Sequence, residues 1–262
     1  MTPEQILSFL AMDTGERILA IDPERAFRTS RTEAASGNAT SVAIIPLQGT
    51  LRPRGSGGMD LFRQRVQEAA ANPDIGAIVL DVDSPGGTVA GTKEAAQAVR
   101  DAGQSKSVTA VVDSLAASAA YWIASQAGSI VLTPSADVGS IGVLCIHMEV
   151  SKALADFGVA ATIMRSVKFK AEGNPFEPLS EEAKANIQDE IDAAHSDFIK
   201  AVAAGRRTSQ AKVSADFGQG RTVGAQKAVD LGMADRIGTM ADVLSGMRTK
   251  GSSFRRRAAF AF

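Results

Sequence analysis

Residues 76–87 read Gly-Ala-Ile-Val-Leu-Asp-Val-Asp-Ser-Pro-Gly-Gly, an apolar run that ends at a turn rich in glycine. A short apolar run bounded by turn residues predicts a strand that is covered on both faces. Similar apolar runs recur at 41–47, 108–112, 129–132 and 140–148. Helical patterns lie between them at 59–71, 89–102 and 116–127. Strands that alternate with helices in this way favour an α/β fold.

The second half of the chain is richer in helical patterns. Ser180 is expected to cap a long helix over 180–204, because two glutamates follow it and apolar residues recur at helical spacing. The other expected elements are helices at 151–157, 209–215 and 223–231, strands at 160–165 and 234–237, a loop at 167–179 and a last helix to about 247. We therefore expect an N-terminal extension at 1–40 with a short helix near 3–12, a domain at 41–247 and a flexible basic tail at 248–262.

The composition excludes several classes of protein. With 45% hydrophobic residues among 262, the chain can bury a large core. Its 28 basic and 29 acidic residues give a net charge of −1, so no overall field recruits nucleic acid or an anionic membrane. The single cysteine, Cys145, forms no internal disulfide and is predicted to be a buried structural thiol, which suits a reducing compartment.

Neither the start of the chain nor its longest uncharged stretch predicts a membrane segment. The N-terminus has no early Lys or Arg and only a short apolar stretch, so we expect no export and a cytoplasmic location. The uncharged stretch between Asp113 and Asp137 is interrupted by serines, glycine and proline. It is better interpreted as a buried helix followed by a buried strand.

Two segments carry candidate catalytic groups. Gly86 and Gly87 follow a strand, where glycine lets the backbone N–H groups approach a ligand and serve as oxyanion donors. Ser118 opens an apolar helix and has two alanines on each side. A serine at a helix start is ordinarily a cap. Here small neighbours leave its hydroxyl open, and the N–H of Ala119 is a second candidate oxyanion donor.

A serine nucleophile needs a base, and the candidates are few. The two histidines are His147, at the end of an apolar run, and His195, among polar neighbours on the long helix. Both are more readily interpreted as structural or solvated residues. A lysine works as a base only if burial lowers its pKa by about three units. Lys168 and Lys170 lie near the end of an expected strand and are predicted to point to opposite sides.

Taken together, the segments 83–87, 116–122 and 138–143 and the loop around Lys170 resemble the signal peptide peptidase A family in order and spacing. The resemblance covers about residues 41–247. Within that family, the chain is most similar to the capsid-maturation peptidases of tailed bacteriophages and prophages. The resemblance implies a Clp protease/crotonase-like spiral of repeated β-β-α units followed by C-terminal helices.

The resemblance also implies a site. Ser118 matches the nucleophile, Lys170 the general base and Ser140 a hydroxyl that orients the lysine. Gly86 or Gly87, with Ala119, matches the oxyanion donors. No metal or other cofactor is implied, and the expected partners are peptide or protein substrates, such as scaffold, portal or capsid proteins of a prohead, and further copies of the chain.

The chain departs from the family pattern at two points. The family usually has glycines after the nucleophile, whereas this chain has alanines, which should narrow the site for small substrate side chains. The family's lysine is commonly followed by an acidic residue, but Ala171 follows Lys170, and Lys168 is a near competitor. The spacing from Ser118 favours Lys170. Alternatives are a signal-peptide-degrading peptidase, a crotonase-type acyl-CoA enzyme and a catalytically inactive capsid assembly factor.

Overall fold

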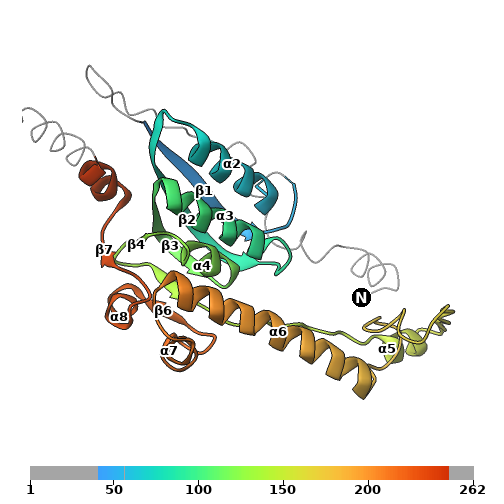
Figure 1. Cartoon of the computed structure of the whole chain (residues 1–262). Helices are drawn as coiled ribbons and strands as arrows, with labels where there is room; N and C mark the ends of the chain where they lie inside the picture. Colours follow the sequence, from blue (N-terminus) through green and yellow to red (C-terminus); the bar gives the residue numbers. More distant parts are fainter. Residues whose placement is uncertain (1–40, 56, 248–262) are drawn as a thin grey trace, which may run out of the picture. The chain divides into compact units, whose positions relative to one another are not determined.

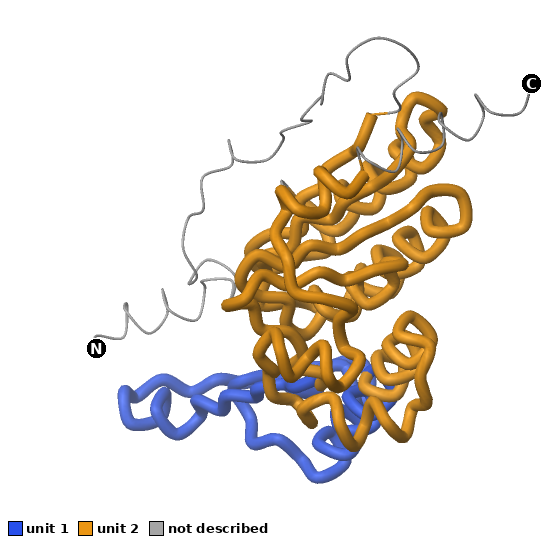
Figure 2. Tube along the Cα trace, turned by 90° about the vertical axis from the view of Figure 1, so that its left-hand side faces the viewer, with its two compact units in different colours: residues 1–22, 143–194 blue, residues 23–142, 195–262 orange. Residues whose placement is uncertain are grey.

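The computed structural model describes residues 41–55 and 57–247. The expected short helix at 3–12 and the basic tail at 248–262 lie outside the described residues. Within them, residues 143–194 form one compact unit, and residues 41–142 together with 195–247 form the other (Figure 2).

The larger unit is built on a seven-stranded sheet. Its main path runs β1 (Ser41–Leu51), β2 (Ile75–Gly87), β3 (Ser107–Ala117), β4 (Ser129–Leu132) and β7 (Arg236–Ile237), and all these neighbours are parallel. β5 (Asp137–Gly139) pairs in parallel with the end of β3 and antiparallel with β6 (Thr222–Gly224). The predicted α/β class is confirmed, with helices between successive parallel strands (Figure 1).

Three helices cover one face of this sheet: α2 (Met59–Ala71), α3 (Thr92–Ser105) and α4 (Ala119–Ala124) (Figure 1). Leu80 and Val112 lie in the core on this side, whereas Val79 and Val111 lie in a second cluster with Val243. Val243 belongs to a helix at 240–247. Because neighbouring side chains of a strand point to opposite faces, both faces need apolar cover. This explains the continuous apolar runs in the sequence.

The C-terminal half of α6 (Glu181–Gly205) packs on this core, followed by α7 (Gln210–Asp216) and α8 (Ala225–Leu231). The ring of Phe198 stacks on Trp122 of α4, with 4.6 Å between ring centroids and 11° between the planes. Val202, one turn further along α6, is fully buried. The apolar spacing in the sequence therefore identified the packed face of this half of the helix.

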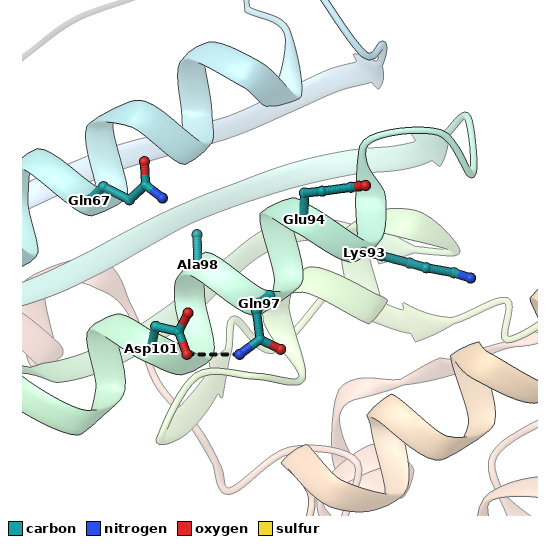
Figure 3. A pocket seen from close by; sticks show the side chains of 6 residues that line it. All are labelled: Gln67, Lys93, Glu94, Gln97, Ala98 and Asp101. Atoms are coloured by element: carbon teal, nitrogen blue, oxygen red, sulfur yellow. Dashed lines mark hydrogen bonds between the residues drawn. The ribbon is translucent and has the colours of Figure 1, made fainter.

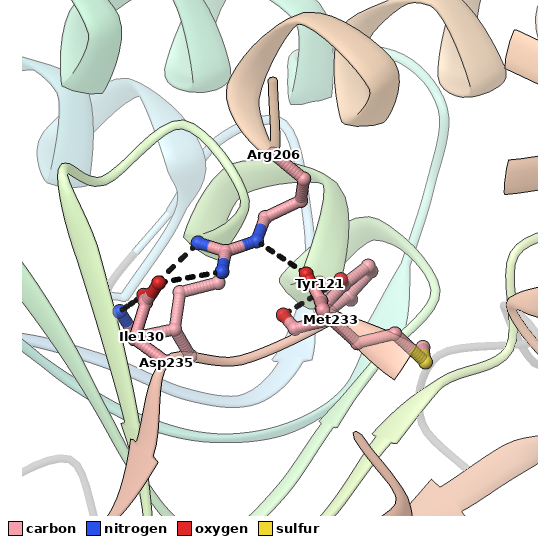
Figure 4. Close-up of polar contacts among 6 residues, drawn as sticks. Tyr121, Ile130, Arg206, Met233 and Asp235 are labelled. Carbon is pink, nitrogen blue, oxygen red and sulfur yellow. Dashed lines mark hydrogen bonds and ion pairs between the residues drawn. The ribbon is translucent and has the colours of Figure 1, made fainter. Parts of the chain in front are cut away.

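A polar cluster joins the end of α6 to the sheet (Figure 4). The guanidinium of Arg206, which is only 7% exposed, donates to Asp235 Oδ1 at 2.8 Å and to the Gly232 carbonyl at 3.1 Å. Asp235 Oδ2 accepts the Ile130 N–H at 2.6 Å, at the start of β4. The hydroxyl of Tyr121, in α4, donates to the Met233 carbonyl at 2.9 Å. The helix that follows Ser118 is thus fixed to the segment before β7.

The smaller unit contains α5 (Ser151–Asp156), a long irregular segment and the start of α6. Ser180 caps α6 as predicted, because its Oγ accepts the Ala183 N–H at 3.1 Å. The Val150 N–H donates to the Pro175 carbonyl at 2.8 Å, which ties the residue before α5 to the later part of the irregular segment.

Several predicted elements are wrong or misplaced. The strands expected at 140–148 and 160–165 do not form, since these segments carry no ladder, and β5 ends at Gly139. Cys145 is exposed, contrary to the expected buried thiol. The apolar pattern of the first segment suggested burial, but Leu144 and Ile146 are each 78% exposed. The helix expected at 116–127 is shorter because residues 115–117 pair with β5.

Candidate active site

Ser118 occupies the one-residue turn between β3 and α4. Its backbone has φ 52° and ψ −125°, a conformation that a residue with a side chain rarely adopts. Both peptide groups of the turn are fixed. The Ser118 N–H donates to the Gly139 carbonyl at 2.8 Å, and its carbonyl accepts the Trp122 N–H at 3.0 Å. A strained strand-to-helix turn of this kind presents a serine hydroxyl at the end of a sheet.

The hydroxyl of Ser118 does not cap the helix. Ser118 holds the N-cap position of α4, but its side chain makes no capping hydrogen bond. Ser118 therefore does not act as a helix cap, which is the usual role of a serine at a helix start. The side chain is partly exposed, while Ala119 and Ala120 after it are buried.

Gly86 lies directly against this turn. A Cβ atom built on Gly86 would be 2.7 Å from Ser118 Cβ, 2.7 Å from the Ala117 carbonyl oxygen and 2.9 Å from Ala119 N. Gly86 also has φ +93°, which strains any residue with a side chain. Two features thus require glycine at 86. The structure brings together two segments that the sequence had singled out separately.

The N–H groups near Ser118 differ in availability. The Gly86 N–H donates to Ser84 Oγ at 3.1 Å. Ala119 N–H belongs to the first turn of α4, whose N–H groups have no acceptor within the helix. Gly87 is exposed, and it is paired in register with Leu51 of β1. Of the two glycines predicted as donors, Gly87 is the one whose N–H is not taken by Ser84.

Ser140 follows β5 as Ser118 follows β3. Ala117 and Gly139 are partners in the parallel ladder, so the two serines leave neighbouring strands at the same level. Ser140 has φ 51°, and its N–H donates to the Arg221 carbonyl at 2.9 Å. Gly139, with φ +127°, has no room for a Cβ because the Arg221 oxygen would be 2.7 Å away. The structure therefore places Ser118 and Ser140 at one edge of the sheet.

Lys170 and Lys168 belong to the compact unit 143–194, and both are exposed. Lys168 Nζ forms an ion pair with Glu182 Oε2 at 2.6 Å and lies 4.5 Å from the centre of the Phe169 ring. A lysine held in an ion pair acts as a base only after that pair opens. The choice of Lys170 over Lys168 as the base stays a prediction from the sequence.

Cys145, His147 and His195 also carry groups that can act as a nucleophile or a base. Cys145 and His147 belong to the extended segment after β5, in the unit 143–194. His147 is partly buried, and its Nε2 has no hydrogen-bond partner within the described residues. His195 lies on α6 and is also partly buried.

A polar surface hollow of about 380 Å³ lies along α2 and α3 (Figure 3). It is lined by Gln67, Lys93, Glu94, Gln97, Ala98 and Asp101. Lys93 is engaged with Asp197 of α6 at 2.5 Å, and Gln97 donates to Asp101 at 2.7 Å. None of the predicted site residues lines this hollow.

Carboxylates gather near the carboxyl end of β2. Burial raises the pKa of Asp81, and the neighbouring charges of Asp113 and Asp83 raise it further, against a hydrogen bond from Gln48. The Gln48 Nε2 donates to Asp81 Oδ2 at 3.0 Å. In the part of the chain that the structure describes, no group of three or more His, Cys, Asp or Glu residues is arranged to hold a metal ion. Within the same residues, every helix is too short or too polar to cross a bilayer.

Comparison of the sequence with protein families assigns the chain to one of them. The family model of Peptidase family S49 matches residues 100–252, more than half of the chain. The chain therefore belongs to peptidase family S49, the signal peptide peptidase A family of serine peptidases, and the predicted resemblance is confirmed. The matched range includes Ser118, Ser140 and Lys170, whereas Gly86 and Gly87 lie before it.

Among curated relatives, the chain is 32% identical to the capsid assembly protease C of Escherichia phage lambda over 215 residues, 79% of this chain and 48% of that protein. It is also 32% identical to the head-tail preconnector protein GP5 of Enterobacteria phage P21, over 79% of this chain and 43% of that protein. A putative signal peptide peptidase SppA of Enterococcus faecium is 30% identical over 71% of this chain and 53% of its own length. The chain thus spans about half the length of the relatives it matches.

Proposed function

We propose that this chain is a serine endopeptidase with a Ser118–Lys170 dyad that processes scaffold, portal or capsid proteins during phage head maturation. The observation that carries the proposal is the turn at Ser118, whose strained backbone presents a hydroxyl that does not cap its helix. The relatives add the substrate class, since one is named a capsid assembly protease and another a head-tail preconnector protein. We also propose that the sheet is part of a Clp protease/crotonase-like spiral.

The chemistry of the dyad is acyl transfer in two steps. Neutral Lys170 Nζ takes the proton of the Ser118 hydroxyl as Oγ bonds to the scissile carbonyl carbon. The resulting oxyanion accepts hydrogen bonds from the N–H groups of Gly87 and Ala119. The C–N bond then breaks, and the lysine proton goes to the leaving amine. A water molecule that loses its proton to Lys170 attacks the acyl carbon and releases Ser118, while the Ser140 hydroxyl orients the lysine.

The proposal makes one demand on the surroundings of the lysine. A neutral lysine requires a desolvated site, and the Lys170 side chain is exposed. The bound substrate or a second copy of the chain must therefore cover it in the active state. Self-association, which the family resemblance also implies, is one of the two ways to supply this cover.

The proposal is tested with the purified 262-residue chain, a generic unfolded protein such as casein, and candidate scaffold, portal and capsid proteins of a phage head. Wild type is expected to cut at least one of the head proteins at defined positions, and folded Ser118→Ala is expected to cut none. Cleavage of leader peptides with no cleavage of any head protein would instead support the signal-peptide-degrading alternative. A wild type that neither cuts any of these nor reacts with a fluorophosphonate at Ser118 would contradict the peptidase function.

A further inference from the structure

The segment that approaches Ser118 is shaped by an irregularity in β2. Between β1 and β2 the register passes from Gln48 opposite Asp83 to Thr50 opposite Gly86. Two residues of β2, Ser84 and Pro85, therefore face Gly49 alone. Extra residues in one strand bend it and aim the following residues in a new direction. This bulge is what turns Gly86 toward Ser118.

The ladder between β2 and β3 changes register at the same place. Val82 pairs with Val112, but the next pair is Ser84 with Ala116. The pairing of β2 with β1 and its pairing with β3 therefore both shift register around Ser84. The backbone there cannot be held by regular ladder hydrogen bonds alone, and Pro85 has no N–H to contribute.

The side chain of Ser84 bridges this gap. Ser84 is 0% exposed, its Oγ donates to the Gly49 carbonyl at 2.6 Å, and the same Oγ accepts the Gly86 N–H at 3.1 Å. A hydroxyl can donate once and accept as well, so a single small side chain satisfies a carbonyl on β1 and an N–H on β2. The hydroxyl thereby links the two sides of the bulge.

This link determines which N–H groups can face the nucleophile. Since Gly86 gives its N–H to Ser84, its own peptide is oriented away from a role as oxyanion donor. The backbone of Gly86 lies close to Ser118 and Ala119, because a Cβ built on Gly86 would be 2.7 Å from Ser118 Cβ and 2.9 Å from Ala119 N. The next peptide group, which contains the Gly87 N–H, follows directly after this close approach to the Ser118 turn.

We infer that Ser84 is a positioning residue of the active site, whose hydroxyl holds the β2 bulge so that the Gly87 N–H serves the oxyanion. The inference rests on the proposed peptidase function, because an oxyanion donor has meaning only for acyl transfer at Ser118. Ser84 itself touches neither the substrate nor the nucleophile hydroxyl. Its effect passes through the Gly86 peptide.

The test compares Ser84→Ala with Ser125→Ala in the full-length chain. Ser125 is a matched control because it is also 0% exposed, donates to the Trp122 carbonyl at 2.7 Å and accepts from Gln126 Nε2 at 2.7 Å. Both variants lose one buried hydroxyl with two hydrogen bonds, so a merely structural role would affect them alike. Thermal unfolding, kcat and KM on casein, and inhibition by a peptide aldehyde are measured for each. The aldehyde forms a tetrahedral adduct whose oxygen occupies the oxyanion site.

For Ser84→Ala we expect kcat to fall about 10- to 100-fold with little change in KM, because oxyanion donors act mainly in the transition state. The aldehyde should bind more weakly by a similar factor, Ser125→Ala should stay within about threefold of wild type, and Ser84→Thr, which keeps the hydroxyl, should recover most of the activity. Should Ser84→Ala not fold, Ser84→Cys carries the same expectation, because a thiol is a weak donor.

Equal kcat values for Ser84→Ala and Ser125→Ala would overturn the inference while leaving the peptidase function intact. A loss that appears in KM alone, with unchanged aldehyde binding, would also overturn it. Failure of the proposed function is recognised separately, since wild type itself would then show no cleavage and no fluorophosphonate adduct at Ser118.

Discussion

Replacing Gly86 with alanine should sharply reduce the proposed peptidase activity, with only a moderate loss of stability. The new Cβ would be 2.7 Å from Ser118 Cβ and from the Ala117 carbonyl oxygen, whereas ordinary contacts begin at 3.4 Å. The turn must therefore move by about 0.7 Å, and a misplacement near 1 Å costs about 100-fold in rate. The positive φ of +93° adds about 1–2 kcal/mol of strain, which appears in the free energy of unfolding.

The matched control is Gly232→Ala. Gly232 has φ +85°, but nothing lies within 4 Å of its hypothetical Cβ, so this variant contains the backbone strain without the clash. Both variants are assayed for casein cleavage, for the rate of fluorophosphonate labelling and for denaturant unfolding. Gly86→Ala should lose activity about 100-fold and Gly232→Ala should keep it. If the two variants have equal activity, the close approach of Gly86 to Ser118 is not required for catalysis, and the reasoning is refuted.

Three further predictions concern stability. Phe198→Ala removes a buried ring that stacks on Trp122, so unfolding in denaturant should show a loss of about 3–5 kcal/mol, and a loss below about 1 kcal/mol would contradict this packing role. Asp81 has a raised pKa, chiefly from burial, so its ionisation weakens the fold as pH rises through that pKa. Asp81→Asn should therefore unfold at a higher temperature than wild type at pH 7, and this gain should disappear in thermal scans below about pH 4. A gain that does not change with pH would contradict the raised pKa of Asp81. Burial alone would raise the pKa of Asp235, but hydrogen bonds from Arg206 and the Ile130 N–H outweigh it and lower the pKa. The ionised Asp235 side chain therefore stabilises the fold above about pH 4, and this stabilisation is lost as the pH falls through the lowered pKa. Asp235→Asn should therefore lower the free energy of unfolding by about 1 kcal/mol at pH 7, a figure that allows for the partial exposure of the Arg206–Asp235 pair. In denaturant unfolding at acid pH, the difference between the variant and wild type should shrink. A difference that stays constant with pH would contradict the stabilising role of ionised Asp235.

The parallel sheet could be predicted from the sequence because its strands are apolar on both faces. The apolar run before Ser84 is uninterrupted because Val79 and Leu80 pack into two different hydrophobic clusters, one on each face of the sheet. The helix at 59–71 was predicted with its observed bounds, because Phe62, Val66 and Ala69 repeat at helical spacing. Local pattern sufficed wherever burial and periodicity agreed.

Local pattern failed after β5. Leu144, Ile146 and Met148 alternate as a strand would, but they are exposed and their segment has no partner in the described chain. A strand is defined by pairing between distant segments, which a short window of sequence does not contain. The same limit explains why the helix at Ser118 was predicted to begin too early, since residues 115–117 are drawn into the ladder with β5.

The candidate site shows a similar division. Ser118 and Gly86 were singled out from their sequence context and Ser140 from the family resemblance, and the structure brings the three residues to one edge of the sheet. The role of Ser84 could not be predicted, because it depends on a register shift relative to β1. The motif Ser84-Pro85-Gly86-Gly87 contained the residue, but only the paired strands give its hydroxyl a function.

The dyad is tested most directly by the rate at which a fluorophosphonate modifies Ser118 in wild type, Lys170→Ala and Lys168→Ala. Lys168 is the matched control because it lies two residues away and its ion pair with Glu182 occupies it elsewhere. The account predicts that Lys168→Ala reacts at the wild-type rate and that folded Lys170→Ala reacts at least about 100-fold more slowly, since the serine then has no base. Normal labelling of Ser118 in folded Lys170→Ala would contradict the Ser118–Lys170 dyad.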